Sequence, residues 1–227
     1  MKFDWPHPIE AVFYDMDGTL LDSEPLTESA VSVFLSKCGI DAVVDATQFH
    51  GVTWFSIAKT LVSLFPTLEG IEVADELSMA FQHALKTQTP PPILGAFNAV
   101  ATSAGLYKTA VVSSSRRKSI HFVVGKMGLA DVVHHIVGAE DVQYSKPHPQ
   151  CFQLAADHFG IPYERCLVFE DSMAGLQAGH NGGMATIAIG PSSEKEPFST
   201  MMIDNYTQLN QTFFEELGSV KYGQGEQ

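Results

Sequence analysis

The sequence predicts an α/β protein, with a doubly wound, Rossmann-like parallel sheet and an inserted all-helical domain. Short apolar segments rich in β-branched residues alternate with helical patterns along most of the chain, which is typical of parallel strands covered by helices on both faces. One segment near the N-terminus has helical periodicity but no convincing strand. With 227 residues, the chain is long enough for a core domain and a smaller accessory domain.

The alternation consists of five expected strands and four expected helices. The strands are expected over residues 11–14, 109–112, 135–137, 166–169 and 186–189. The helices are expected over residues 94–103, 116–127, 149–159 and 172–181. Helices commonly stop at glycine, and the expected stops are Gly105, Gly128 and Gly160.

The all-helical segment interrupts this rhythm directly after the first strand. Its helices are expected over residues 29–37, 54–64 and 73–85. It returns to the core through residues 87–92, where consecutive prolines favour a stiff, extended connection. We therefore expect a core of residues 1–22 and 90–227 and a helical domain of residues 23–89.

Composition excludes several classes of function. The chain has 26 acidic and 13 basic residues, and its formal charge of -13 repels polyanions such as nucleic acids. The densest basic run, Arg116, Arg117 and Lys118, is too short for a DNA-binding surface. No segment resembles a signal peptide or a membrane span, and the three cysteines lack metal-ligand spacing. We expect a soluble, cytoplasmic protein with reduced thiols.

Two carboxylates follow the first expected strand. Asp15 and Asp17 are two residues apart, so an extended backbone directs both side chains to the same side. In a doubly wound sheet, ligands bind at the carboxyl edge of the strands, where this pair would lie. Taken alone, the pair is equally compatible with an ordinary turn.

Polar residues also follow the other expected strands. Ser113 to Ser115 form a hydroxyl-rich turn before a helix, and Glu170 and Asp171 follow a later strand. Lys146 lies between them, held by neighbouring prolines. Each feature has an ordinary alternative, namely a helix cap, a helix-dipole contact or an exposed lysine. Their joint order favours one shared site for an anion.

This order resembles the haloacid dehalogenase superfamily, and two phrases resemble its branch of sugar phosphatases and β-phosphoglucomutases. The phrases are DMDGTLLDSE from Asp15 and FEDSMAGL from Phe169. The resemblance implies that Asp15 attacks phosphorus and that Asp17 is the general acid and base. It implies Mg²⁺ as cofactor, held by Asp15, the main-chain carbonyl of Asp17 and Asp171, with Glu170 in or near the metal shell.

Simple electrostatics agrees with this assignment. Magnesium prefers hard oxygen ligands, and the carboxylates alone would repel a phosphate dianion. The metal and Lys146 cancel that repulsion. Ser113 and the backbone amides of Ser114 and its neighbours would bind the remaining phosphoryl oxygens.

By the same resemblance, the helical domain is a mobile cap that closes over the site and selects the substrate. Its candidate substrate contacts are His50, Thr53 and Trp54, although Trp54 is equally compatible with the cap core. Mutases of this branch carry an arginine and a histidine where this chain has Trp54 and Thr27. Since a bisphosphate intermediate needs a second cationic anchor, these departures weaken a mutase interpretation.

We therefore expect a magnesium-dependent phosphatase that hydrolyses a small organic phosphomonoester, with sugar and polyol phosphates as the leading class. Asp17 argues for ester chemistry, because dehalogenases and phosphonate hydrolases of the superfamily lack that carboxylate. A phosphosugar mutase and a non-catalytic phosphate-sensing protein on the same fold remain the alternatives. The expected partner is a small phosphorylated metabolite, without nucleic acid or membrane, and the expected assembly is a monomer or a weak homodimer.

Overall fold

The chain folds into two compact units, shown in a computed structural model that describes residues 3–49, 54–88, 90–190 and 192–219. The α/β unit comprises Met1–Leu20 and Pro92–Gln227, and the helical unit comprises Leu21–Pro91. The expected boundaries at residues 22 and 90 lie two residues from these.

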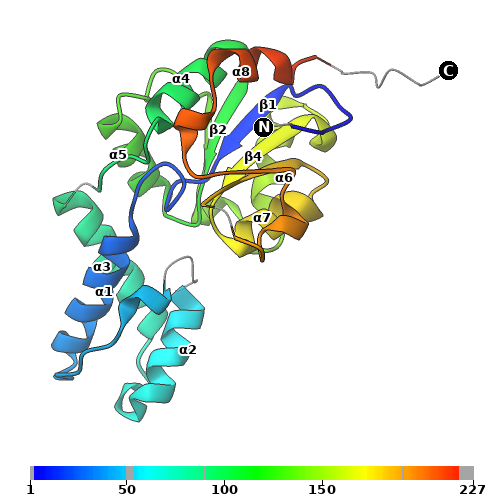
Figure 1. Cartoon of the computed structure of the whole chain (residues 1–227). Coiled ribbons are helices and arrows are strands. Elements are labelled where there is room, and N and C mark those ends of the chain that lie inside the picture. The colour runs from blue at the N-terminus through cyan, green and yellow to red at the C-terminus, as the bar shows by residue number, and fades with distance from the viewer. Residues whose placement is uncertain (1–2, 50–53, 89, 191, 220–227) are drawn as a thin grey trace. The chain divides into compact units, whose positions relative to one another are not determined.

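A six-stranded, all-parallel sheet forms the centre of the α/β unit (Figure 1). The strand order is β3-β2-β1-β4-β5-β6, so the chain runs outward from β1 in one direction and then in the other. This order confirms the doubly wound sheet. The strands are β1 (Ala11–Tyr14), β2 (Lys108–Val112), β3 (His135–Val137), β4 (Cys166–Glu170), β5 (Ala185–Ile189) and β6 (Met201–Ile203).

Helices cover both faces of this sheet. The side chain of Phe13 packs against the ring of Phe159, whereas the hydroxyl of the next residue, Tyr14, hydrogen-bonds Ser103. Because neighbouring residues of a strand point to opposite faces, the helices that carry these partners lie on opposite sides of the sheet. The helices are α4 (Ala96–Leu106), α5 (Arg117–Lys126), α6 (Gln150–Phe159), α7 (Met173–Asn181) and α8 (Gln211–Leu217).

The sheet core explains why the strands are almost continuously apolar. All four residues of β1 are buried, as are all five of β4 and β5. Strands buried on both faces lose the alternation of polar and apolar residues. The core on the α6 side joins residues of β1, β2, β4, α6 and α7, among them Phe13, Val112, Phe152, Val168 and Ala178.

The helical unit consists of α1 (Glu24–Lys37), α2 (Trp54–Leu64) and α3 (Val73–Thr87), with short 3-10 turns at Ala46–Phe49 and Pro66–Leu68. It has its own apolar cluster, in which Phe34, Ile57, Leu61 and Leu77 are buried. Among the described residues, no helix is both long and apolar enough to cross a membrane.

Some expected boundaries were wrong for identifiable reasons. α1 begins five residues early, since Pro25 is tolerated in the first helical turn. α4 continues through Gly105, which is therefore not its stop, whereas Gly160 ends α6 in the left-handed conformation. β6 and α8 were not expected. β6 has only three residues, too few for a recognisable period.

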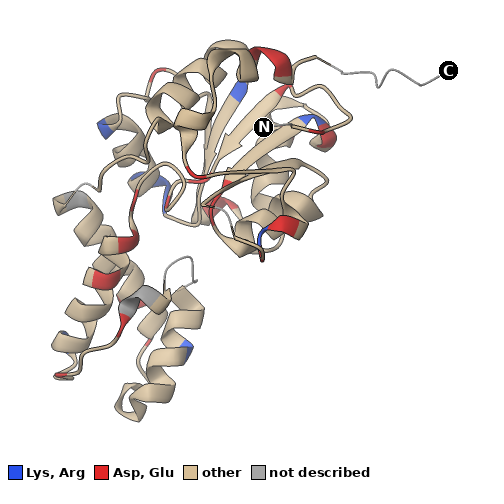
Figure 2. Cartoon of the chain, viewed as in Figure 1, with Lys and Arg blue, Asp and Glu red and all other residues tan. Residues whose placement is uncertain are grey.

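The charge distribution agrees with the acidic composition. In the view of Figure 2, Asp and Glu are spread over both units, and Lys and Arg are scattered over the described part of the chain. Scattered cations do not neutralise a row of phosphates. A polyanionic partner is therefore disfavoured.

Candidate active site

The end of β1 brings Asp15 to the carboxyl edge of the sheet. The Asp15 amide donates to the carbonyl oxygen of Phe169 at 3.0 Å, which continues the pairing of β1 with β4 by one residue. The side chain is buried, with a residue exposure of 6%. The chain then turns at Gly18, whose φ of 80° is in the left-handed region that favours glycine. A rigid central strand therefore fixes this carboxylate.

Lys146 lies between two buried carboxylates. Its Nζ donates to Asp15 Oδ1 and to Glu170 Oε1, both at 2.6 Å. The three side chains are exposed by only 7%, 9% and 1%, respectively. The ammonium also lies 5.0 Å from the ring centre of Phe152. One cation therefore joins the residue that follows β1 to the last residue of β4.

The end of β4 and the turn after it fix the side chains of Glu170 and Asp171. Glu170 Oε2 accepts hydrogen bonds from the amide and the hydroxyl of Ser172, both at 2.9 Å. The Ser172 hydroxyl in turn accepts from the Gly175 amide at the start of α7, which is an N-cap. Asp171 Oδ1 accepts from the Thr19 hydroxyl at 2.8 Å. Helix capping and acid placement thus depend on the same few residues.

Two glycines make room for these carboxylates. A Cβ atom on Gly175 would lie 1.7 Å from Glu170 Oε1, and one on Gly18 would lie 2.2 Å from Asp171 Oδ2. Neither position has room for a side chain while the acids keep their places. The glycines of both motifs therefore have a packing role at the site.

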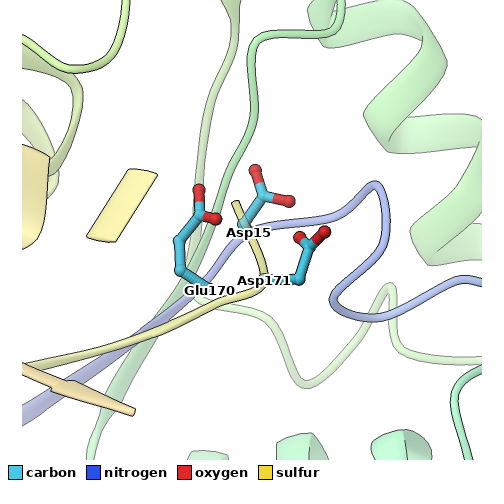
Figure 3. A group of neighbouring side chains, drawn as sticks. All are labelled: Asp15, Glu170 and Asp171. Atoms are coloured by element: carbon cyan, nitrogen blue, oxygen red, sulfur yellow. The ribbon is translucent and has the colours of Figure 1, made fainter. Parts of the chain in front are cut away.

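The carboxylates of Asp15, Glu170 and Asp171 form a group that fits a divalent cation. Each offers one oxygen, and these oxygens lie within 4.8 Å of one another. Figure 3 shows the three side chains directed to the same side of the strand ends. Three carboxylates and the single ammonium of Lys146 leave a formal charge of −2. Hard oxygen donors with excess negative charge are the ligands that Mg²⁺ prefers.

The pKa values of these groups show the cost of crowding them. Burial raises the pKa of Asp15 well above its usual value. The charge of Lys146 lowers this pKa, whereas the neighbouring carboxylates of Glu170, Asp171 and Asp17 raise it further. Burial and the charge of Glu170 raise the pKa of Asp171 to about 7, against the hydrogen bond from Thr19. Burial lowers the pKa of Lys146, but Asp15 and Glu170 outweigh burial and raise it well above its usual value. A bound cation would relieve the repulsion among the acids.

The turn after β2 supplies hydroxyl groups. The Ser113 amide donates to the Val137 carbonyl at 3.0 Å, so β2 and β3 hold the start of this turn. Asp17 Oδ2 accepts hydrogen bonds from the hydroxyl of Ser115 at 2.9 Å and from that of Ser113 at 3.4 Å. Ser114, between the two, is exposed. The turn thus contacts the second carboxylate of the β1 motif.

The structure brings together the residues that the sequence singled out in the α/β unit. Lys146 donates hydrogen bonds to both Asp15 and Glu170, and a separate hydrogen bond joins Ser113 to Asp17. In the helical unit, His50 and Thr53 lie outside the described residues. Trp54 is half-buried against the apolar cluster, with its ring 5.3 Å from that of Phe81. A substrate contact by Trp54 stays a prediction.

Three hydroxyl residues in these contacts received no role of their own from the sequence. Thr19 and Ser172 stand inside the two motif phrases, and Ser115 stands two residues after Ser113. The two-residue spacing that pairs Asp15 with Asp17 also predicts that Ser113 and Ser115 share a side. Applied to this turn, the rule would have identified Ser115.

Comparison with known proteins confirms the family resemblance. The family described as haloacid dehalogenase-like hydrolase matches residues 12–189. The chain is 28% identical over 180 residues to fructose-1-phosphate phosphatase of Escherichia coli (strain K12), covering 78% of this chain and 95% of that protein. It is 29% identical over 203 residues to hexitol phosphatase B of the same strain, covering 85% and 89%. A crystal structure of β-phosphoglucomutase from Clostridium difficile superposes with a TM-score of 0.73 at 20% identity, covering 92% of this chain and 96% of that one.

Proposed function

The chain belongs to the haloacid dehalogenase-like hydrolase family, and from this premise we propose that it hydrolyses a small sugar or polyol phosphate through a phosphorylated Asp15. The observation that carries the proposal is the buried Asp15 carboxylate, 2.6 Å from the Lys146 ammonium and grouped with Glu170 and Asp171. Fructose-1-phosphate phosphatase and hexitol phosphatase B, among its relatives, support the substrate class.

Asp15 is the nucleophile in this proposal. An oxygen of its carboxylate forms a bond to phosphorus while the bond from phosphorus to the ester oxygen breaks. Asp17 gives its proton to the departing oxygen and later takes one from water. That water forms a bond to phosphorus, the bond to Asp15 breaks, and its electron pair returns to the carboxylate. The net reaction converts a phosphate ester and water into an alcohol and inorganic phosphate.

The other groups balance charge and hold the phosphoryl oxygens. When bound by Asp15, Asp171 and the Asp17 carbonyl, Mg²⁺ supplies the positive charge that lets a phosphate dianion approach a carboxylate. Lys146 adds a second cation, and the contact with Glu170 fixes its ammonium. The other oxygen of Glu170 already accepts a hydrogen bond from Ser172. We therefore assign Glu170 to positioning Lys146 next to the metal site. Ser113 and the Ser114 amide bind the remaining phosphoryl oxygens.

We assign substrate selection to the helical unit, as the resemblance to capped phosphatases implies. Its described helices leave large apolar side chains exposed, including Val33, Phe55 and Met79. Contacts at such a surface discriminate between substrates by their shape more than by their charge.

The decisive experiment measures inorganic phosphate release from fructose 1-phosphate, a hexitol phosphate and a nucleoside monophosphate. Each is tested with Mg²⁺ and with chelator. The wild type is expected to release phosphate only with the metal, and Asp15→Asn is expected to lose at least about 10³-fold in kcat, because an amide is a poor nucleophile. Asp204→Asn, at an exposed position of the same unit, is the control and should retain activity.

Two outcomes would contradict the proposal. Retained turnover in Asp15→Asn would exclude the phosphorylated aspartate. Isomerised sugar phosphate in the presence of a bisphosphate, without phosphate release from any ester, would indicate a mutase.

A further inference from the structure

Asp17 is tied to the turn after β2 by a hydroxyl to which no role has yet been assigned. Ser115 Oγ donates to Asp17 Oδ2 at 2.9 Å across 98 positions of the sequence. Ser113 Oγ reaches the same oxygen at 3.4 Å, near the limit for a hydrogen bond. The shorter contact makes Ser115 the stronger of these two partners of this oxygen.

The Ser115 hydroxyl is not needed to build its own turn or the next helix. It is the Ser115 amide, and not the hydroxyl, that donates to Ser113 Oγ, at 2.9 Å. The N-cap position of α5 is Arg116, and no side chain caps that helix. A purely local role therefore does not account for the contact with Asp17.

The chemistry of Ser113 makes a second donor useful. A serine hydroxyl has one proton to donate. If Ser113 donates that proton to a phosphoryl oxygen, as in the proposed function, it no longer donates to Asp17. Ser115 then remains as a donor to Asp17 Oδ2. The carboxyl group keeps its orientation while the phosphate is bound.

We propose that Ser115 is a positioning residue that orients Asp17 for proton transfer to the leaving group. The inference rests on the proposed phosphatase function. In the first half-reaction, the proton of Asp17 moves to the ester oxygen as its bond to phosphorus breaks; in the second, Asp17 regains a proton from water. Ser115 keeps its own proton throughout, so it acts by holding the carboxyl group of Asp17 and not as an acid or a base.

A comparison of leaving groups tests this role. An alkyl phosphate such as a hexitol phosphate needs a proton on its departing oxygen, whereas p-nitrophenyl phosphate expels a stable phenolate and hardly needs one. Ser115→Ala is expected to lower kcat/KM for the alkyl ester about 3- to 10-fold, because kcat/KM reports transfer from the ester to Asp15 and because losing a hydrogen bond to a neutral carboxyl group costs about 1 kcal/mol. The kcat/KM for p-nitrophenyl phosphate should fall less than about 2-fold, since its phenolate leaves without a proton.

Three further variants make the result specific. Ser115→Thr keeps the hydroxyl and should restore most of the alkyl-ester rate. Ser115→Cys replaces Ser115→Ala if the alanine variant does not fold, since a thiol of similar size is a weak donor. Ser193→Ala removes an exposed serine of the same unit and should match the wild type for both esters.

The outcomes separate this inference from the function beneath it. An equal fall in kcat/KM for both esters, or no fall for either, would overturn the positioning role and leave the phosphatase intact. A wild type that releases phosphate from neither ester would overturn the proposed function, and the role of Ser115 with it.

Discussion

The two units of the chain bury different kinds of side chains. Among the described residues of the helical unit, Ser23 is the one buried polar or charged side chain. The buried polar and charged side chains of the α/β unit are Asp15, Thr19, Ser103, Thr109, Ser113, Ser119, Glu170 and Thr186. Four of these eight, Asp15, Thr19, Ser113 and Glu170, take part in the contacts of the site. Burying polar groups is costly unless they are paired, so their concentration marks the place where the fold holds chemistry.

The two units also differ in their exposed apolar side chains. Among the described residues, those of the helical unit are Val33, Val43, Phe55, Leu64, Ile71 and Met79, and those of the larger α/β unit are Leu94, Phe97, Leu106 and Tyr144. Apolar surface carries no reaction by itself, but it can select a ligand by shape. In the proposed function, the internal contacts of the α/β unit carry the reaction and the helical unit contributes through its surface.

Gly175→Ala tests how closely packing controls the site and has the largest expected effect of the three changes that follow. The added methyl group would occupy the place of Glu170 Oε1, at 1.7 Å. Displacing Glu170 removes a partner from both Lys146 and Ser172. We expect a loss of about 10- to 100-fold in kcat/KM and, from overpacking, about 1–3 kcal/mol in the free energy of unfolding. Steady-state kinetics and denaturant unfolding measure the two effects.

Gly105→Ala is the matched control for this change. Gly105 lies in α4, and a Cβ there would meet nothing within 4 Å. Alanine should therefore stabilise the protein by up to about 1 kcal/mol and leave kcat/KM unchanged. If Gly175→Ala behaves like this control, the contact between Gly175 and Glu170 does not constrain the site.

Chelated protein should lose stability as the pH rises, because the pKa of Asp171 in the folded state is about 7. The pKa of an unfolded aspartate is about 3.9, so the folded state binds a proton more tightly than the unfolded state. The stability that the folded state gains from binding this proton is fully present below about pH 4 and is lost as the pH rises through 7. We expect Tm in chelator to fall by several °C between pH 5.5 and 8.5, since about 1 kcal/mol corresponds to ~2–4 °C for a chain of this size.

Magnesium should reduce this fall, because it binds the deprotonated carboxylates and binds more tightly as the pH rises. Asp171→Asn should reduce the pH dependence in chelator, to which the raised pKa of Asp15 also contributes, and should weaken the response to Mg²⁺. Glu69→Gln removes an exposed acid of the helical unit and should follow the wild type. Thermal unfolding curves of equal pH slope for the wild type and Asp171→Asn would remove Asp171 from the titrating group.

The comparison of units also explains which parts were predictable from the sequence. Period and composition identify buried parallel strands, and the acids and serines stand at the ends of those strands. The shared edge of a parallel sheet then requires Asp15, Ser113 and Glu170 to meet. The contact of Glu170 with Ser172 is local, two residues along the chain, but nothing in a local pattern shows that its other oxygen binds Lys146, which comes from another loop.

Other elements were beyond such reasoning for physical reasons. β6 is a three-residue edge strand that pairs only with β5, so its formation depends on the sheet already present. Gly105 was read as a helix stop, but glycine costs a helix only about 1 kcal/mol, which tertiary packing readily outweighs. The role of Trp54 was equally open, since one aromatic residue at a helix start fits a core or a ligand contact.

Trp54→Phe addresses the helical unit and has the smallest expected effect. Trp54 packs against Phe81 and the apolar cluster, and phenylalanine keeps most of this contact. We expect a loss of about 1 kcal/mol in the free energy of unfolding, with the ratio of kcat/KM between a sugar phosphate and a hexitol phosphate within about 2-fold of the wild type. Phe55→Ala, at the next and exposed residue, should leave the free energy of unfolding within about 0.5 kcal/mol of the wild type. If Trp54→Phe instead reorders the two substrates at unchanged stability, Trp54 contacts the substrate, and the helical unit selects through an aromatic ring that the sequence already singled out.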